Sequence, residues 1–198
     1  MADTPLDSVI ATLRRRLPVR ADVVRPQAAV ALILVRNPDR LLLIRRADRA
    51  GDPWSGHLAL PGGRRAVGDA TLLDTAIRES HEEVGITLTT SECMAELDDL
   101  VPMTAVLPPI VVRPFLFLVG DVPSVGVSDE VASVAWLPLA TLAASGAYRT
   151  TTVMIRGERR DVAAYPLEAG VLWGMTERIV TPLVDLWRAA TAGGDRPA

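Results

Sequence analysis

The sequence has 198 residues, the size of one globular domain or of one domain with an added helix. Hydrophobic residues make up 49% of the chain, but no stretch approaches the run of about 20 apolar residues that crosses a bilayer, so a membrane protein is not expected. The net charge of -3 and the isoelectric point near 5.4 argue against wholesale binding to nucleic acid or to anionic membranes.

The N-terminal residues and the number of cysteines indicate the expected cellular location. Cys93 is the single cysteine of the sequence, so neither a disulfide framework nor a cysteine-based zinc site is expected. The N-terminus begins with acidic and polar residues and lacks the basic and then apolar pattern of a secretory signal. A cytoplasmic location is expected by default. We expect a helix and lead-in over residues 1–25, the main domain over 26–190 and a flexible tail over 191–198.

The first part of the chain predicts one helix and a β-hairpin. Residues 5–17 have the amphipathic pattern of a short helix. Two apolar runs, 28–35 and 41–45, flank the turn-forming sequence Asn-Pro-Asp at 37–39. These runs are therefore predicted to be neighbouring strands.

A glycine-rich loop and a helix follow. A short strand over residues 58–60 leads into Pro-Gly-Gly at 61–63, where adjacent glycines allow backbone conformations that other residues resist. Apolar or small residues recur at helical spacing over 71–84, and Gly85 stands where a helix C-cap belongs. The pattern predicts a tight, functional loop joined to a helix.

Acidic residues are expected to stabilise the start of this helix. Asp69 lies just upstream, where its carboxylate can cap the first turn. Asp74 and Arg78 are four residues apart, which predicts an ion pair on the helix surface.

The second half of the chain mixes strands and helices. In order, the pattern predicts a strand over 111–119, a strand over 131–136, a short helix over 137–144, β structure within 151–164 and a long helix over 171–190. Trp173 is expected to anchor this last helix, and Pro182 to kink it. The mixed order indicates an α+β domain.

One segment carries the chemistry. Residues 78–86 read RESHEEVGI, in which Glu79, Glu82 and Glu83 stand at positions i, i+3 and i+4 of the predicted helix and so share one face, expected to be exposed. Like charges at this spacing repel by a few tenths of a kcal/mol per pair. A divalent cation would remove that cost, and oxygen ligands suit Mg²⁺ or Mn²⁺.

A solvated acidic helix face is the alternative explanation of the three glutamates. The sequence around them favours the metal site. The segment PGGRR at 61–65 precedes the helix and can bring backbone groups to the same ion, and Gly85 closes the helix directly after the acids. The histidine at position 81 is expected to point away from the three glutamates by helical phase.

The same stretch resembles the signature of the Nudix family, in which a glycine, five residues, a glutamate and seven residues precede REUxEExGU, with U aliphatic. The residues at signature positions are Gly63, Arg78, Glu79, Glu82, Glu83, Gly85 and Ile86. Ser80 replaces an aliphatic residue, and as a small residue it can still face the core. The interval from Gly63 to Arg78 is one residue longer than usual, and Asp69 replaces the upstream glutamate.

The longer interval is similar to that of the coenzyme A pyrophosphatase-like branch of the Nudix family, which often has an aspartate at the position of Asp69. Similarity to this branch extends over about residues 26–186. Trp54 and His57 depart from it, because they stand where the branch usually has a histidine and an acid or amide. This change falls in the stretch associated with coenzyme A.

The resemblance implies a Nudix-like α/β/α sandwich with a mixed β-sheet and a metal-dependent hydrolase. The implied reaction cleaves a phosphoanhydride bond in a small nucleoside diphosphate derivative, with coenzyme A or an acyl-CoA first, giving 3',5'-ADP and phosphopantetheine. Another diphosphate, such as ADP-ribose or a dinucleotide, is an alternative substrate. A non-catalytic Nudix-fold ligand-binding domain is a second alternative, and a homodimer is left open.

The resemblance also implies residue roles. The metal ligands would be Glu79, Glu82, Glu83 and the Gly63 carbonyl, with Arg78 orienting the carboxylates. The general base would be Glu79 or a carboxylate from a distant loop, with Glu130 the first candidate. The weaker candidates are Asp98, Asp99 and Asp129.

Substrate contacts are predicted beside the glycine loop. Arg45 and Arg46 end a strand that leads toward the loop and could grip phosphate through the guanidinium fork, and Gly62 lies in the loop itself. Trp54 is expected either to stack on a base or to pack under the loop. His57 is expected to be a structural residue rather than a proton carrier.

Overall fold

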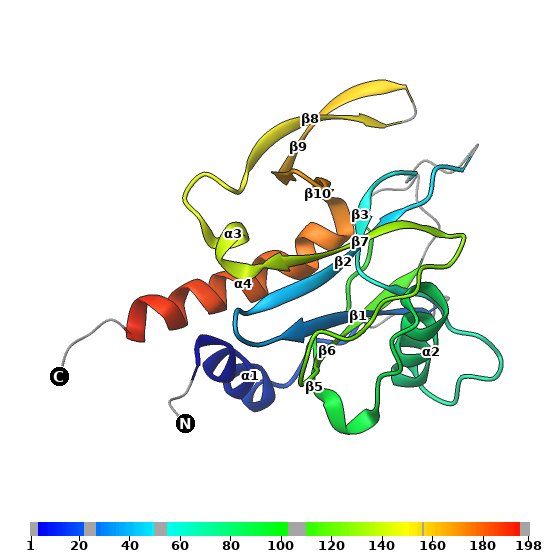
Figure 1. The fold of residues 1–198 in the computed structure, drawn as a ribbon, viewed down its shortest axis with the longest axis vertical. Coiled ribbons are helices and arrows are strands. Elements are labelled where there is room, and N and C mark those ends of the chain that lie inside the picture. Colours follow the sequence, from blue (N-terminus) through cyan, green and yellow to red (C-terminus); the bar gives the residue numbers. More distant parts are fainter. Residues whose placement is uncertain (1–3, 22–26, 50–54, 103–109, 156, 195–198) are drawn as a thin grey trace.

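The computed structural model describes residues 4–21, 27–49, 55–102, 110–155 and 157–194, so Trp54 lies outside the described residues. The elements, in chain order, are α1 (Pro5–Arg15), β1 (Gln27–Val35), β2 (Arg40–Arg46), β3 (Leu58–Ala59), β4 (Gly62–Arg64), α2 (Leu72–Val84), the 3-10 turn η1 (Thr90–Glu92), β5 (Cys93–Glu96), β6 (Val111–Leu118), β7 (Val131–Pro138), α3 (Leu139–Ala143), β8 (Arg149–Ile155), β9 (Glu158–Leu167), β10 (Gly170–Trp173) and α4 (Gly174–Gly194). Figure 1 shows their arrangement.

The main sheet is mixed. β1 pairs in parallel with β6 and antiparallel with β2 and β4, while β5 pairs antiparallel with β6. β2 pairs along its whole length with β7 and, near its end, with β3. A second, antiparallel sheet has the order β10-β9-β8 and arches over the body in Figure 1.

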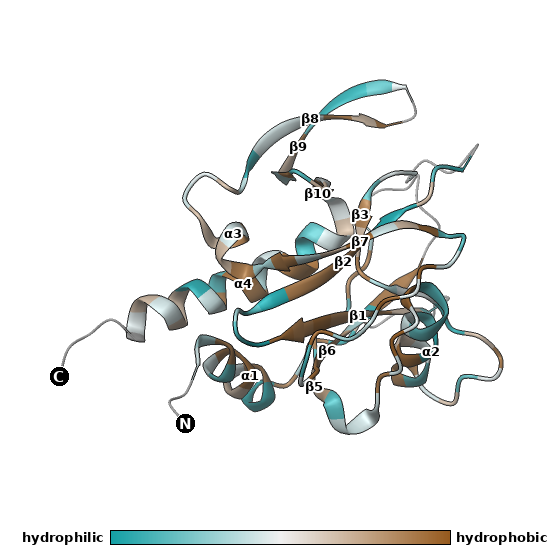
Figure 2. Ribbon diagram, viewed as in Figure 1, coloured by the Kyte–Doolittle hydropathy of each residue, from teal (hydrophilic) through white to brown (hydrophobic). Residues whose placement is uncertain are grey.

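Helices cover both faces of the main sheet. Alternate residues of β1 enter two separate clusters of buried side chains, as the two-residue period of a strand requires. One cluster contains side chains of α1, α3 and α4, and the other contains those of α2. The strands between them are the most hydrophobic part of the ribbon in Figure 2. The expected α/β/α sandwich with a mixed sheet is confirmed.

Most predicted elements are confirmed. The helix at the start of the chain, the hairpin, the helix after the glycine loop and the strands β6 and β7 all form close to their predicted bounds. β8 and β9 supply the β structure expected within 151–164. The strands β4 and β5, which have only three and four residues, were not predicted.

The predicted closing helix begins too early. Residues 171–173 belong to β10, and α4 starts only at Gly174. Gly170 and Gly174 have φ values of 139° and 70°, conformations that L side chains rarely adopt, so the backbone changes direction on both sides of the short strand. Trp173 is therefore a strand residue and does not anchor the helix from within it.

In the described ranges, no helix combines the length and the apolar composition that crossing a membrane requires.

Candidate active site

The helix that carries the glutamates is capped at both ends. Thr71 is the N-cap of α2 and exchanges hydrogen bonds with Asp74, whose carboxylate accepts from the Thr71 N–H at 2.8 Å. Gly85, with φ of 70°, is the C-cap, and its N–H donates to the His81 carbonyl at 2.9 Å. The predicted C-cap is confirmed. The predicted cap by Asp69 and the predicted Asp74–Arg78 ion pair are wrong, because Asp74 serves the cap.

The glycine loop packs directly against this helix. The Gly62 N–H donates a hydrogen bond of 2.8 Å to Oε2 of Glu83. A Cβ atom on Gly63 would overlap the Glu79 carboxylate, and one on Gly62 would overlap the Ala29 carbonyl of β1. Only glycine therefore lets the backbone of β4 lie between the central strand and the two carboxylates.

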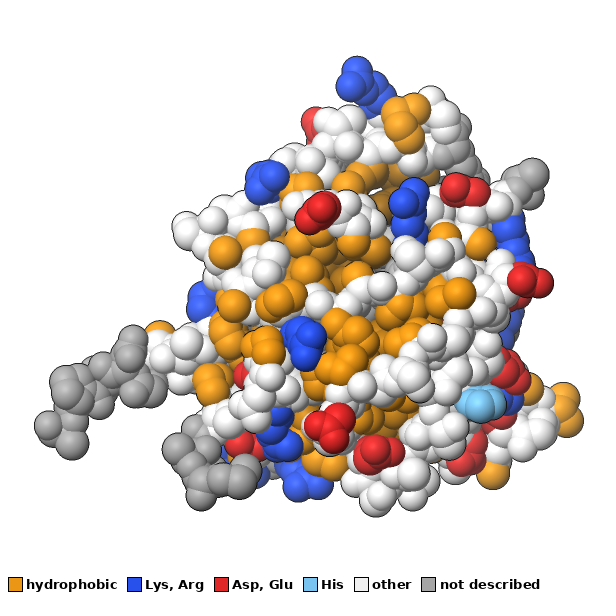
Figure 3. All heavy atoms as spheres, viewed as in Figure 1, with side chains coloured by type: hydrophobic (Ala, Val, Ile, Leu, Met, Phe, Trp, Pro, Cys, Tyr) orange, Lys and Arg blue, Asp and Glu red, His pale blue; other side chains and the backbone are white. Residues whose placement is uncertain are grey.

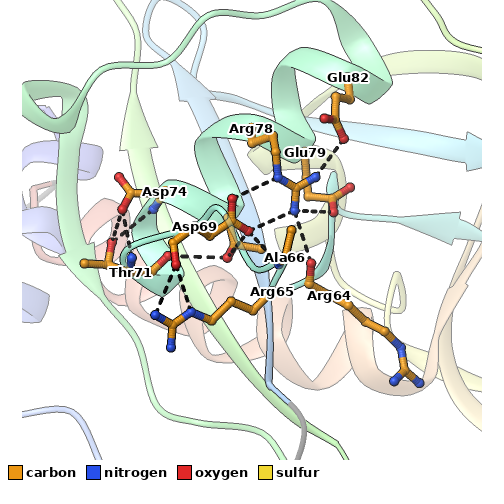
Figure 4. A network of polar contacts seen from close by, with 10 residues as sticks. Arg64, Arg65, Ala66, Asp69, Thr71, Asp74, Arg78, Glu79 and Glu82 are labelled. Carbon is orange, nitrogen blue, oxygen red and sulfur yellow. Dashed lines mark hydrogen bonds and ion pairs between the residues drawn. The ribbon is translucent and has the colours of Figure 1, made fainter.

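Asp69 holds the arginine of the signature in place (Figure 4). Nε and Nη2 of Arg78 both donate to the Asp69 carboxylate, each at 3.0 Å. The Asp69 carboxylate also accepts from the Ala66 N–H at 2.8 Å and from the Thr75 hydroxyl at 2.9 Å. The hydrogen bonds from Arg78 hold the pKa of Asp69 well below its ordinary value. The longer loop thus supplies a buried aspartate that forms a bidentate ion pair with Arg78.

The same guanidinium reaches two of the glutamates. Arg78 Nη2 lies 2.9 Å from Glu79 Oε1, and Nη1 lies 2.7 Å from Glu82 Oε2. Nη2 also donates to the Arg64 carbonyl at 3.1 Å. Arg78 is therefore positioned to orient carboxylates, as the resemblance implies.

The three glutamates differ in burial. Side-chain exposure is 16% for Glu79 and 55% for Glu82, whereas Glu83 as a whole residue is only 5% exposed. The expectation of one exposed face is wrong for Glu83, because the glycine loop covers it. Burial raises the pKa of Glu83 to about 7, and the Gly62 N–H opposes that rise. Burial also raises the pKa of Glu79, while Arg78 opposes the rise.

These groups suit a hard divalent cation in their chemistry. The donors are carboxylate oxygens next to the Gly62-Gly63 backbone, and a cation would offset the cost of buried negative charge. Among the described residues, no three carboxylate, histidine or cysteine side chains converge as a finished metal site in this arrangement. The reason is visible in Figure 4, where Arg78 draws Glu79 and Glu82 toward itself.

The two arginines of β2 lie on opposite faces of the sheet. Arg45 is paired with Leu58, which belongs to the cluster of α1 and α4, and Arg45 is exposed. Arg46 follows it and faces α2, where its charge acts on Glu83 and lowers the pKa of that carboxyl. Only Arg46 therefore lies on the side of the glutamates, which we call the α2 face.

Glu130 also approaches the site. The segment before β7 is tied to the end of α2, because Ser128 donates its N–H to the Glu83 carbonyl at 3.1 Å and Gly126 donates to the Val84 carbonyl at 3.0 Å. The charge of Glu130 contributes to the raised pKa of Glu83. Its carboxylate is paired with Arg49 at 3.1 Å.

The weaker candidates for the base have other roles or lie apart. Asp99 accepts two hydrogen bonds from Arg113, at 2.7 and 3.0 Å, next to β5 and β6. Asp98 accepts from the Val19 N–H at 2.8 Å. These contacts join the segment after α1 to the sheet. Asp129 is exposed in the turn before β7.

The two histidines lie in different surroundings. His81 is exposed on α2, as its helical phase relative to the glutamates predicts, and its Nδ1 lies 3.3 Å from the Thr87 hydroxyl. His57 is opposite Arg46, whose N–H donates to the His57 carbonyl at 3.0 Å. The His57 ring packs edge-on against Trp173, with ring centroids 5.0 Å apart. Sequence reasoning missed Trp173 beside the site, although the glycines flanking Val171, Leu172 and Trp173 were a signal for a short strand.

Comparisons with known proteins agree with this geometry. Residues 25–155 match the NUDIX domain family. The chain is 31% identical over 171 residues to the uncharacterized Nudix hydrolase NudL of Cronobacter sakazakii, covering 83% of this chain and 84% of that protein. It is 30% identical over 165 residues to NudL of Escherichia coli strain SMS-3-5, covering 79% and 80%. A Schizosaccharomyces pombe protein, the uncharacterized C14C4.10c, is 40% identical over 107 residues.

The match to the Schizosaccharomyces pombe protein covers 52% of this chain, and this chain spans 32% of that protein's length.

Solved structures show the fold. A MutT/nudix family protein from Enterococcus faecalis has a TM-score of 0.58 at 20% identity, covering 88% of this chain and 68% of that one. A C. elegans Ap4A hydrolase has a TM-score of 0.52 at 18% identity, covering 85% and 98%.

The family match extends over more than half of the chain and includes the glycine loop and the glutamate helix, and the two NudL proteins resemble the chain over most of their length. The chain therefore belongs to the Nudix family, among its pyrophosphohydrolases.

Proposed function

We propose that this protein is a metal-dependent hydrolase that adds water across a phosphoanhydride bond in a nucleoside diphosphate derivative. The observation that carries the proposal is the contact of the Gly62-Gly63 backbone with the carboxylates of Glu83 and Glu79. This contact places buried negative charge beside backbone groups and Arg46, an arrangement suited to cation and phosphate binding.

The proposed metal ligands are Glu79, Glu82, Glu83 and the Gly63 carbonyl, and the proposed ion is Mg²⁺ or Mn²⁺. When bound, such an ion polarises phosphoryl oxygens and lowers the pKa of water. The chain's own residues orient the reactants. Arg78, fixed by Asp69, holds the glutamate carboxylates in position, and Arg46 offers its guanidinium to a phosphate on the α2 face.

Two carboxylates are candidates for the general base. Glu79 lies against the Gly63 backbone, and burial raises the pKa of Glu79 toward the range that suits proton transfer. Glu130 approaches from the segment before β7 and is held by Arg49. Replacing each glutamate in turn by glutamine distinguishes the two candidates. Loss of the general base removes the fall in turnover at low pH, because that fall reports protonation of the base.

We propose coenzyme A or an acyl-CoA as the substrate, cleaved to 3',5'-ADP and phosphopantetheine or its acyl form. Support comes from the resemblance to the coenzyme A pyrophosphatase-like branch, in particular from the longer loop and Asp69. The alternatives are ADP-ribose or a dinucleotide, and a Nudix-fold domain that binds such a ligand without turnover. Arg45 points away from the α2 face and is not included among the phosphate contacts.

The test is a panel of diphosphates incubated with Mg²⁺ or Mn²⁺, with products identified by mass spectrometry. Glu83→Gln and Glu79→Gln should each lower turnover more than about tenfold at saturating metal, a loss above roughly 1.4 kcal/mol. His81→Ala is the matched control on the same helix and should retain turnover, because His81 is exposed and points away from the glutamates. Equal losses in all three variants, or no hydrolysis of any diphosphate, would overturn the proposal.

A further inference from the structure

Two hydrogen-bond donors lie on the α2 face at the end of β2 opposite Arg46. Leu42 of β2 belongs to the buried cluster that contains side chains of α2, so Arg40, two residues earlier in the strand, faces the same side. Trp136 of β7 is directly across from Leu42 and packs against the same cluster. Arg40 and Trp136 are therefore diagonal neighbours on two paired strands, a spacing that long and aromatic side chains span.

Each of these two side chains has a buried N–H group without an acceptor. Among the described residues, Nε of Arg40 and Nε1 of Trp136 are enclosed and make no hydrogen bond. Both groups only donate, so neither satisfies the other. A buried donor that has given up its hydrogen bond to water costs free energy until an acceptor takes the place of the water. One acceptor that reaches both groups would remove this cost.

The charge of Arg40 indicates that the acceptor is an anion. In the described part of the chain, no carboxylate lies within ion-pair distance of the Arg40 guanidinium. Asp39, the preceding residue, accepts a hydrogen bond of 2.7 Å from Trp187 Nε1 of α4, on the other side of the sheet. On the face drawn in Figure 3, the described Arg side chains are interspersed with Asp and Glu rather than gathered in one basic patch. Local donors, and not a broad positive field, would therefore hold the anion.

We propose that Arg40 and Trp136 form a second anion site, which binds a phosphate or carboxylate group through the guanidinium and the indole N–H. Both side chains are half-buried, so the site borders solvent. The second anion site is separate from the candidate active site, because Arg40 stands six residues before Arg46, about 20 Å along a strand. The inference therefore does not depend on the proposed hydrolase function.

The test follows the side-chain N–H signals of ¹⁵N-labelled protein by NMR while sodium phosphate or sodium acetate replaces sodium chloride at constant ionic strength. The Trp136 indole and the Arg40 Nε–H signals should shift together and saturate with one dissociation constant, because one anion contacts both groups. The Trp187 indole is the internal control, since it already donates to Asp39 and should not move. The salt that saturates the shift at the lower concentration identifies the bound group as phosphate or carboxylate.

Arg40→Gln should weaken the binding that the Trp136 signal reports by about tenfold or more, because a charge-assisted contact is lost. Arg159→Gln is the matched control, since it removes the same charge from an exposed position of β9 and should bind the anion as wild type does. If Arg40→Gln does not fold, Trp136→Phe keeps an aromatic ring but removes the N–H, and the Arg40 Nε–H signal should then report weaker binding.

Three results would overturn the inference. They are a Trp136 indole signal that neither phosphate nor acetate moves, shifts of Trp136 and Arg40 that saturate with different dissociation constants, and equal affinity in the Arg40 and Arg159 variants. Each of them leaves the proposed hydrolase function standing, because the measurement contains no diphosphate substrate.

Discussion

Glu83 combines two properties that conflict in the metal-free protein. Its carboxyl is buried beneath the glycine loop, yet it accepts the Gly62 N–H at 2.8 Å. Burial penalises the ionised form, and one backbone hydrogen bond recovers only part of the cost, so the pKa of Glu83 rises to about 7. A cation beside the carboxylate would reverse this balance. At neutral pH, this residue therefore links protonation, metal binding and stability.

We expect the stability of the metal-free protein to fall as pH rises through the pKa of Glu83. A carboxyl whose pKa is higher in the folded than in the unfolded protein contributes to stability in full when the pH is below the unfolded-state pKa of 4.5. That contribution is lost as the pH rises past about 7. The loss is on the order of 3 kcal/mol for this group. Glu83→Gln removes it, so the variant should be more stable than wild type at pH 8 and similar at pH 4.5, in urea unfolding with chelator present.

Glu82→Gln is the matched control for this comparison, because Glu82 is mostly exposed and turned toward Arg78. It should follow the wild-type pH profile. A Glu83→Gln profile parallel to that of wild type would show that the raised pKa of Glu83 is not the source of the pH dependence.

At the scale of elements, the end of α2 depends on its glycine cap. Gly85 has φ of 70°, and a Cβ there would also approach the Gly126 nitrogen at 3.3 Å. Gly85→Ala should therefore lower the free energy of unfolding by about 1–2 kcal/mol. Gly68→Ala, in the loop before α2, should be neutral, since a Cβ there would meet nothing within 4 Å.

Thermal unfolding of the two variants provides the measurement. The melting temperature should fall by about 2–4 °C per kcal/mol for Gly85→Ala in a protein of this size. An equal effect of the two alanines would contradict the importance of the left-handed cap.

Local sequence patterns were sufficient for α2 and for the β1–β2 hairpin, because helical spacing, a glycine cap and a turn sequence act over a few residues. They failed at β10. Val171 and Leu172 continue the apolar spacing of α4, and what separates strand from helix is the backbone direction at Gly170 and Gly174 together with pairing to β9. The short β4 forms for a similar reason, since its partner β1 lies far away in the chain.

The site shows the same division. The spacing of the glutamates and their phase relative to His81 follow from helix geometry, so these could be predicted. The burial of Glu83 could not be predicted, because it depends on a loop about 20 residues upstream. The pairing of Asp69 with Arg78 was not predicted either, because it depends on how the loop before α2 folds back onto the helix. Strand alternation predicts that Arg45 and Arg46 lie on opposite faces, but deciding which of them faces α2 required the register of β2 with β3.

At the scale of the whole molecule, the N-terminal helix is part of the core opposite the candidate site. α1 packs on α4 and β5, and Leu6, Val9 and Ile10 are buried in the cluster that lines this side of the sheet. Asp7 forms an ion pair with Arg36 at the end of β1. The helix therefore stabilises the sheet without touching the glutamates.

Leu6→Ala should destabilise the protein by about 2–5 kcal/mol, because it leaves a cavity in this cluster. Well below the melting temperature, KM should stay unchanged, since α2 covers the other face of the sheet. Ser8→Ala, at an exposed position of the same helix, is the control and should change neither property. A change in KM for Leu6→Ala that exceeds its effect on folded fraction would contradict this separation of the two faces.

The hydrogen bonds from Gly126 and Ser128 to the last carbonyls of α2 have a consequence for hydrogen exchange. A helix leaves its final carbonyls without partners inside the helix, and here a segment some 40 residues further along the chain supplies two of the donors. The two amides can exchange with deuterium only when this junction opens. Exchange at Gly126 and Ser128 should therefore keep pace with opening of the last turn of α2, so that helix end and segment act as one cooperative unit.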